Sequence, residues 1–95
     1  MPAYIIANVE VTDAATYEEY RKQVPAIIAA HGGRYLARGG AAEALEGEVA
    51  ANRLVILEFP DMAHVKAFYT SAEYRPLIKL RNKAARSSLM AVEGV

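Results

Sequence analysis

The sequence predicts an α+β domain whose elements follow the order strand, helix, strand, strand, helix, strand. Two observations predict this order. Apolar residues alternate with other residues in four short segments, and they recur at helical spacing in two longer segments. The 95 residues suit a single domain over residues 1–95. We therefore expect a four-stranded antiparallel sheet with the helices on one face.

The first strand and the first helix are marked by a change of period. Residues 3–11 read as a strand, and Thr12-Asp13 supplies a helix N-cap, because a short side-chain oxygen accepts from free amide groups. The helix is expected to run to about His31. Pro25 predicts a kink or a break inside it, because proline cannot donate to the preceding turn. The inward stripe is Tyr17, Tyr20, Val24, Ile27, Ile28 and His31.

Glycine pairs divide the middle of the chain. Gly32-Gly33 ends the helix, and residues 34–38 form the second strand. Gly39-Gly40 predicts a bulge or bend, after which the strand resumes through about Glu46. A turn is then expected over residues 47–52.

The second half repeats the pattern. Residues 53–59 form the third strand. Pro60-Asp61 ends this strand and caps a second helix, which breaks at residues 71–74 and resumes near Pro76. Residues 87–93 form the fourth strand. The inward positions of the two helical pieces are Met62, Val65, Phe68, Tyr69, Leu77, Leu80 and Ala84. The whole order is the split βαβ, or ferredoxin-like, arrangement.

Alternation along each strand separates two sheet faces. The face expected under the helices carries Ile5, Ala7, Val9, Tyr35, Ala37, Val55, Leu57, Phe59, Met90 and Val92. The other face carries Tyr4, Ile6, Asn8, Glu10, Arg34, Leu36, Arg38, Leu54, Ile56, Glu58, Leu89, Ala91 and Glu93. Its aliphatic residues form too much apolar surface for a monomer, so a second copy of the chain is the simplest cover. The arginines and glutamates there should pair with one another.

Composition excludes several classes of protein. Eleven basic and eleven acidic residues cancel, which gives no electrostatic reason to bind nucleic acid or a membrane surface. The absence of cysteine excludes disulfides and thiolate metal sites and fits a cytoplasmic protein. The N-terminus lacks a signal-peptide pattern, and no apolar run is long enough for a membrane span.

Several segments together resemble a known family. They are AYIIANVEVTD at residues 3–13, HGGRYLARGG at 31–40, RLVILEFP at 53–60, AFYTSAEY at 67–74 and VEGV at 92–95. The chain is similar to the domain-of-unknown-function family 1330 of the dimeric α/β-barrel superfamily. This resemblance implies a homodimer whose two sheets pack face to face, and it implies no activity. The wider superfamily includes cofactor-free monooxygenases, muconolactone isomerase-like enzymes and haem-binding proteins, which is an analogy of fold only.

Three residues are candidate catalytic groups. His31 could act as a general acid or base, or it could bond carbonyl groups at the helix C-terminus. Arg38 could hold a substrate carboxylate or enolate while Glu58 orients it. The alternative is a structural ion pair between Arg38 and Glu58 across the dimer interface.

Four residues are candidate substrate-binding groups: Asn8, Tyr20, Tyr69 and Tyr74. Ordinary packing of the tyrosines, with their hydroxyls reaching water, is the alternative. Arg75 and Arg81 are expected to be solvated. His31 and His64 fall on different helices, so we expect no metal site.

These observations favour a small homodimer that binds or transforms a small polar organic molecule without a tightly bound cofactor. The pocket is expected beside the sheet, lined by Tyr20, His31, Arg38, Glu58 and Tyr69. Because the face that predicts the dimer also carries the charges, it is the first place to look for a site. A non-catalytic binding or structural dimer is the alternative, and a haem protein with His31 as axial ligand is a third hypothesis. Whether the protein is an enzyme stays open.

Overall fold

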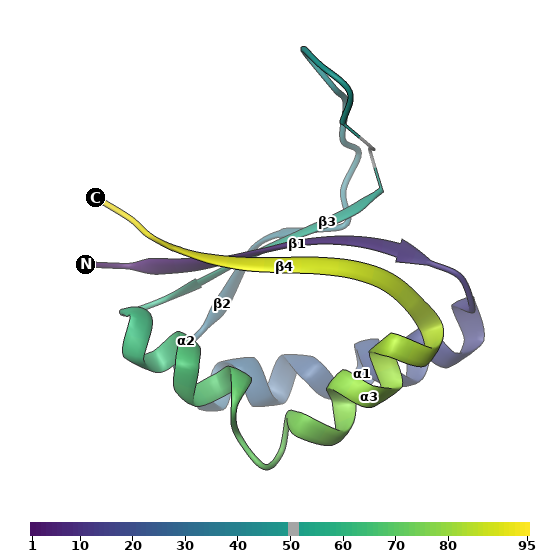
Figure 1. The fold of residues 1–95 in the computed structure, drawn as a ribbon. Helices are drawn as coiled ribbons and strands as arrows, with labels where there is room; N and C mark the ends of the chain where they lie inside the picture. Colours follow the sequence, from purple (N-terminus) through teal and green to yellow (C-terminus); the bar gives the residue numbers. More distant parts are fainter. Residues whose placement is uncertain (50–51) are drawn as a thin grey trace.

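The chain forms one four-stranded sheet covered on one face by three helices (Figure 1). The computed structural model describes residues 1–49 and 52–95. The elements are β1 (Ala3–Val11), α1 (Ala14–Ala30), β2 (Arg34–Arg38), β3 (Arg53–Phe59), α2 (Met62–Tyr69), α3 (Arg75–Ala84) and β4 (Ala85–Glu93). The predicted order is confirmed, with the second helix divided into α2 and α3 at the expected break.

The sheet is antiparallel and its strand order is β2-β3-β1-β4. Figure 1 shows the connection between β2 and β3 rising from the sheet on the side away from the helices. Residues 40–49 of this connection are all exposed. The expected continuation of β2 to Glu46 is wrong, because β2 ends at Arg38. The turn expected over residues 47–52 includes residues 50 and 51, which lie outside the described residues.

The helix starts follow their predicted caps. Asp13 caps α1 by accepting from the backbone amide of Thr16 at 3.2 Å, and Asp61 caps α2 by accepting from the amide of His64 at 2.9 Å. α1 continues through Pro25 without a break. A proline removes one hydrogen bond, whereas the buried stripe along α1 holds the whole helix against the sheet. That stripe consists of Tyr17, Tyr20, Val24 and Ile28.

The register of β4 differs from the expected one. The strand follows α3 directly and begins at Ala85, two residues before its predicted start. Leu89 lies opposite Ala7 and packs against the core, while Met90 and Val92 are 66% and 45% exposed. The face assignment of β4 was therefore reversed. Apolar residues occupy both alternating sets in this strand, so its pattern alone could not fix which set is covered.

The register of β2 also changes within the strand. Tyr35 pairs with Leu57, but Ala37 pairs with Ile56 and Arg38 with Val55, so a bulge lies between Tyr35 and Ala37. One extra residue in a strand moves every later side chain to the other face. Arg38 therefore joins the helix-covered face and Ala37 the open face, which corrects the assignment of both.

The open face of the sheet carries an apolar patch that spans β1, β3 and β4, and Glu10 and Arg86 lie opposite one another at one end of the same face. Ile6, Met90 and Val92 are 36%, 66% and 45% exposed, and Ile56 beside them is half-buried. The side chain of Leu36, at the bulge in β2, is 49% exposed. No helix in residues 1–49 or 52–95 is long and apolar enough to cross a membrane.

A candidate ligand site between sheet and helices

A cavity of about 50 Å³ lies between the helix-covered face of the sheet and the helices. Strand residues such as Ile5, Ala7 and Val55 form its apolar side, and Val24 of α1 closes part of the other. Tyrosine and arginine side chains complete the lining. Apolar cavities with a few converging polar groups are typical of small-molecule sites.

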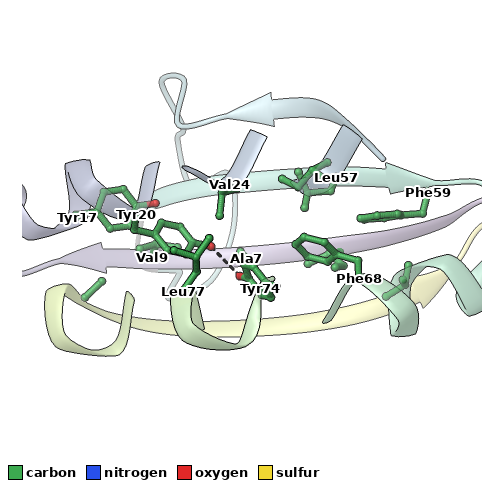
Figure 2. Close-up of a cluster of buried hydrophobic side chains, with 14 of the residues drawn as sticks. Ala7, Val9, Tyr17, Tyr20, Val24, Leu57, Phe59, Phe68, Tyr74 and Leu77 are labelled. Atoms are coloured by element: carbon green, nitrogen blue, oxygen red, sulfur yellow. Dashed lines mark hydrogen bonds between the residues drawn. The ribbon is translucent and has the colours of Figure 1, made fainter. Parts of the chain in front are cut away.

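Two tyrosines and one arginine form a buried hydrogen-bonded chain in the lining of this cavity. The hydroxyl oxygens of Tyr20 and Tyr74 lie 2.7 Å apart, and Nη1 of Arg81 donates to the Tyr74 hydroxyl at 2.7 Å. Tyr74 is 2% exposed and Arg81 is 5% exposed. Figure 2 shows the Tyr20 and Tyr74 hydroxyls pointing toward one another between the helices. The expectation that Arg81 is solvated is therefore wrong.

The local sequence explains how these groups meet. Ser71 accepts from the backbone amide of Tyr74 at 3.2 Å and donates to the carbonyl of Phe68 at 2.8 Å, which fixes the break between α2 and α3. Leu77 and Arg81 are four residues apart on α3, so they share its inward face with Ala84. This spacing indicates that Arg81 is buried. Sequence reasoning placed Arg81 in solvent because arginine side chains are usually exposed.

The hydrogen-bonded chain leaves one hydroxyl hydrogen unused. Arginine has only donors, so the Tyr74 oxygen accepts from Arg81. Either hydroxyl can donate in the bond between Tyr20 and Tyr74. Because two hydroxyl hydrogens share this one bond, one of them is available to a further acceptor in either arrangement.

Burial sets the protonation of the tyrosines. It raises the pKa of Tyr74 well above its usual value, and the neighbouring Tyr20 adds to this effect. Burial also raises the pKa of Tyr17 and Tyr35. These three hydroxyls are therefore protonated at neutral pH.

Three further arginines line the cavity. The guanidinium carbon of Arg38 lies 4.5 Å from the ring centre of Tyr35, and that of Arg53 lies 5.7 Å from the ring centre of Tyr17. Arg21 donates to Glu18 at 2.7 Å.

Gly39 makes room for Arg53. It has a φ of +72°, and a Cβ at this position would collide with the Arg53 guanidinium. Sequence reasoning missed Arg53 as a lining residue, although its place in strand β3, two residues before Val55, put it on the covered face.

Two of the predicted site residues lie on the other side of the sheet. Glu58 accepts from Nη2 of Arg34 at 2.6 Å, so its ion-pair partner is Arg34 rather than Arg38. Asn8 lies on the open face, opposite Leu54 on β3. The bulge in β2 separates Arg38 from both residues.

His31 and Tyr69 lie near the covered face but do not line the cavity. Nδ1 of His31 is 3.0 Å from the carbonyl oxygen of Ile27, and its ring packs edge-on to Phe68. His31 therefore bonds a carbonyl group at the C-terminus of α1, which was the alternative to a catalytic role. This geometry gives no support to the hypothesis that His31 is a haem ligand. Tyr69 is 41% exposed and lines an open groove beside Met90 of β4. In the described part of the chain, no group of three or more His, Cys, Asp or Glu side chains could hold a metal ion.

Comparison with known proteins supports the fold. The model of the family described as Domain of unknown function (DUF1330) matches residues 2–95. No curated protein matches the chain in sequence.

Solved structures share the fold at low sequence identity. A protein of unknown function from Rhodopseudomonas palustris has a TM-score of 0.79 and 20% identity, over 99% of this chain and 82% of its own. SnoaB, a cofactor-independent oxygenase from Streptomyces nogalater, has a TM-score of 0.68 and 12% identity, over 99% and 93%. A dimeric ferredoxin-like protein of unknown function from a Jannaschia species has a TM-score of 0.67 and 13% identity, over 99% and 100%. At these identities the likeness establishes the ferredoxin-like fold alone.

Proposed function

This chain belongs to the family described as Domain of unknown function (DUF1330), and we propose that it binds a small organic molecule in the cavity between its sheet and its helices. One observation carries the proposal. The cavity of about 50 Å³ combines an apolar wall with the buried chain Tyr20–Tyr74–Arg81, in which one of the two hydroxyl hydrogens is left for an acceptor. Buried polar groups that serve packing alone normally satisfy one another.

The proposal includes a homodimer formed through the open face of the sheet. The exposed side chains of Ile6, Met90 and Val92 lie together on neighbouring strands β1 and β4. Removing such a surface from water is favourable, and a second copy of the same face covers it symmetrically. The Jannaschia protein, which shares the fold, is described as dimeric, and this supports a dimer.

We propose further that any reaction at this site proceeds without a tightly bound cofactor. The cavity is several times smaller than the ~300–1,000 Å³ that pockets for larger ligands occupy. SnoaB shows that this fold can support cofactor-independent oxygenase activity in another protein. The reaction classes to assay are proton transfer and the oxidation of an activated carbon acid by dioxygen. A binding protein without turnover is the alternative.

Nuclear magnetic resonance titration tests the binding proposal. The probes are acetate, acetamide and 2-propanol, added separately to the ¹⁵N-labelled protein. We expect at least one probe to shift the amide resonances of residues around Tyr20, Tyr74 and Val24. Shifts confined to other parts of the chain, or no saturable shift with any probe, would overturn the proposal.

A matched pair of variants locates the binding. Ala7 lines the cavity, whereas Ala91 lies on the same sheet face outside it. Ala7→Val adds two methyl groups to the cavity and should abolish binding of every probe. Ala91→Val adds the same groups beside the open groove and should leave binding unchanged.

A further inference from the structure

We infer that the ligand of this cavity is a small organic anion, a short carboxylate or enolate, held by the guanidinium of Arg81 and the hydroxyl of Tyr20. The inference rests on the proposed function and specifies the ligand's charge.

The first argument is the charge of the cavity. Its lining includes four arginines, and within the described residues it includes no aspartate or glutamate. Arg21 is neutralised by Glu18 outside the cavity. Arg38, Arg53 and Arg81 form no ion pair with a carboxylate of residues 1–49 or 52–95. The cavity therefore has an excess of positive charge that its own described side chains do not balance.

The second argument is the burial of Arg81. The side chain is 5% exposed, and its Nε has no hydrogen-bond partner among the described residues. Its Nη1 bonds a neutral hydroxyl, and its guanidinium carbon lies 5.9 Å from the ring centre of Tyr20. A buried cation is costly unless an opposite charge pairs with it. An anion supplied from outside removes that cost, and a guanidinium suits a carboxylate because its donors lie in one plane.

The third argument is the unused hydrogen of the hydrogen-bonded chain. Arg81 donates to Tyr74, and Tyr74 and Tyr20 share one hydrogen bond in which either can donate. The hydroxyl hydrogen that this bond leaves over belongs to a chain polarised by a cation, so it is a stronger donor toward a negative oxygen. A neutral ligand would use this donor less well, and a cation would be repelled by the arginines.

The size of the cavity limits the anion. An engineered cavity of about 150 Å³ accepts benzene. A cavity of about 50 Å³ therefore suits a carboxylate of a few non-hydrogen atoms, such as acetate. Arg21 and Arg38 are exposed and so mark the rim, where a longer tail of the ligand would emerge.

The experiment compares acetate with acetamide, which has the same shape and no charge, by chemical-shift titration at constant ionic strength. We expect acetate to bind the unaltered protein at least about 10-fold more tightly than acetamide, because charged hydrogen bonds are the stronger ones. Arg81→Gln should weaken acetate binding by about 10-fold or more. Arg75→Gln changes an exposed arginine at the start of the same helix and should leave binding unchanged.

A second variant covers the case in which Arg81→Gln does not fold. Tyr20→Phe removes only the Tyr20 hydroxyl and should weaken acetate binding several-fold, with acetamide binding changed less. Equal binding of acetate and acetamide in the cavity would overturn the anion inference and leave the proposed function standing. Acetate binding that Arg75→Gln weakens as much as Arg81→Gln would also overturn it. Failure of every probe to bind would overturn both.

Discussion

The two faces of the sheet differ in where they place charge. On the covered face, Arg53 and Arg81 approach the cavity without a carboxylate partner among the described residues. On the open face, Arg34 and Glu58 pair with one another, Glu10 lies opposite Arg86, and Ile6, Met90 and Val92 form an exposed aliphatic patch. The alternation of the sequence suggested one face for both the dimer and the site. The proposed dimer face and the proposed ligand cavity lie on opposite sides of the sheet, so association and ligand binding should respond to different substitutions.

The largest expected effect is on association. Ile6→Glu places a carboxylate in the middle of the open face, between Ile56 and Met90. An uncompensated buried charge costs ~3–5 kcal/mol, and a symmetric dimer contains it twice. We expect the dimer dissociation constant to rise on the order of 10⁴-fold, measured by analytical ultracentrifugation.

The control for this substitution is Ala29→Glu, which adds the same charge at an exposed position of α1 and should leave the dimer intact. Acetate binding should persist in monomeric Ile6→Glu if the two faces act independently. A protein that stays dimeric with this carboxylate would show that its interface lies elsewhere.

The next effect is on the stability of each subunit. Phe68 is 1% exposed, and its ring centre lies 4.3 Å from that of Tyr74 and 5.4 Å from that of Phe59. In the monomeric Ile6→Glu background, Phe68→Ala should lower the free energy of unfolding by ~3–5 kcal/mol. Met90→Ala in the same background should change it by less than ~0.5 kcal/mol, because Met90 is exposed in the single subunit. Urea denaturation measures both changes. If Phe68→Ala and Met90→Ala lowered the free energy of unfolding equally, the covered and open faces would not differ in their contribution to stability.

A smaller effect is expected at the rim of the cavity. Arg38 is exposed and packs over the ring of Tyr35, so its charge is screened by water. Arg38→Ala should weaken acetate binding only about 2–5-fold and leave the dimer unchanged. The sequence suggested Arg38 as the main anion-holding residue. Complete loss of acetate binding in this variant would show that Arg38 on β2, rather than Arg81 on α3, is the main residue that binds the anion.

Several features of the fold and of the candidate site could be predicted from the sequence. Both helix caps, the break before Tyr74 and the covered faces of β1 and β3 followed from local patterns that depend on few neighbours. Tyr20 and Tyr74 were selected as ligand-contacting groups, and the structure brings them within a hydrogen bond of each other. That role stays a prediction until a ligand is tested.

What could not be predicted depends on contacts between distant segments. The bulge in β2 has no glycine at its own position, Leu36, and the expected irregularity was placed at Gly39-Gly40, which begins three residues later. β4 carries apolar residues at both alternating sets, so only its pairing with β1 decides that Leu89 is covered. Arg81 was placed in solvent by the average behaviour of arginine, although its spacing from Leu77 put it on the buried face.

The smallest expected effect concerns the helix layer on the covered face at low pH. The hydroxyl and the amide of Thr16 donate to Asp13 and hold the pKa of this carboxyl below its usual value. A carboxyl whose pKa is lower in the folded chain adds stability above the unfolded pKa, and that contribution is lost as pH falls through the folded pKa. Asp13→Asn keeps an N-cap acceptor but removes the titration.

We therefore expect Asp13→Asn to lower the melting temperature by a few degrees at most at pH 7, with a difference from the unaltered protein that shrinks below about pH 4. Thermal denaturation followed by circular dichroism between pH 3 and pH 7 measures this. Asp61 caps α2 in the same way, with its pKa lowered by His64, so the variant should still lose part of its stability in acid. A difference that grows as pH falls would show that Asp13 is not stabilised in its ionised form. The start of α1 would then depend on contacts with the sheet rather than on its cap.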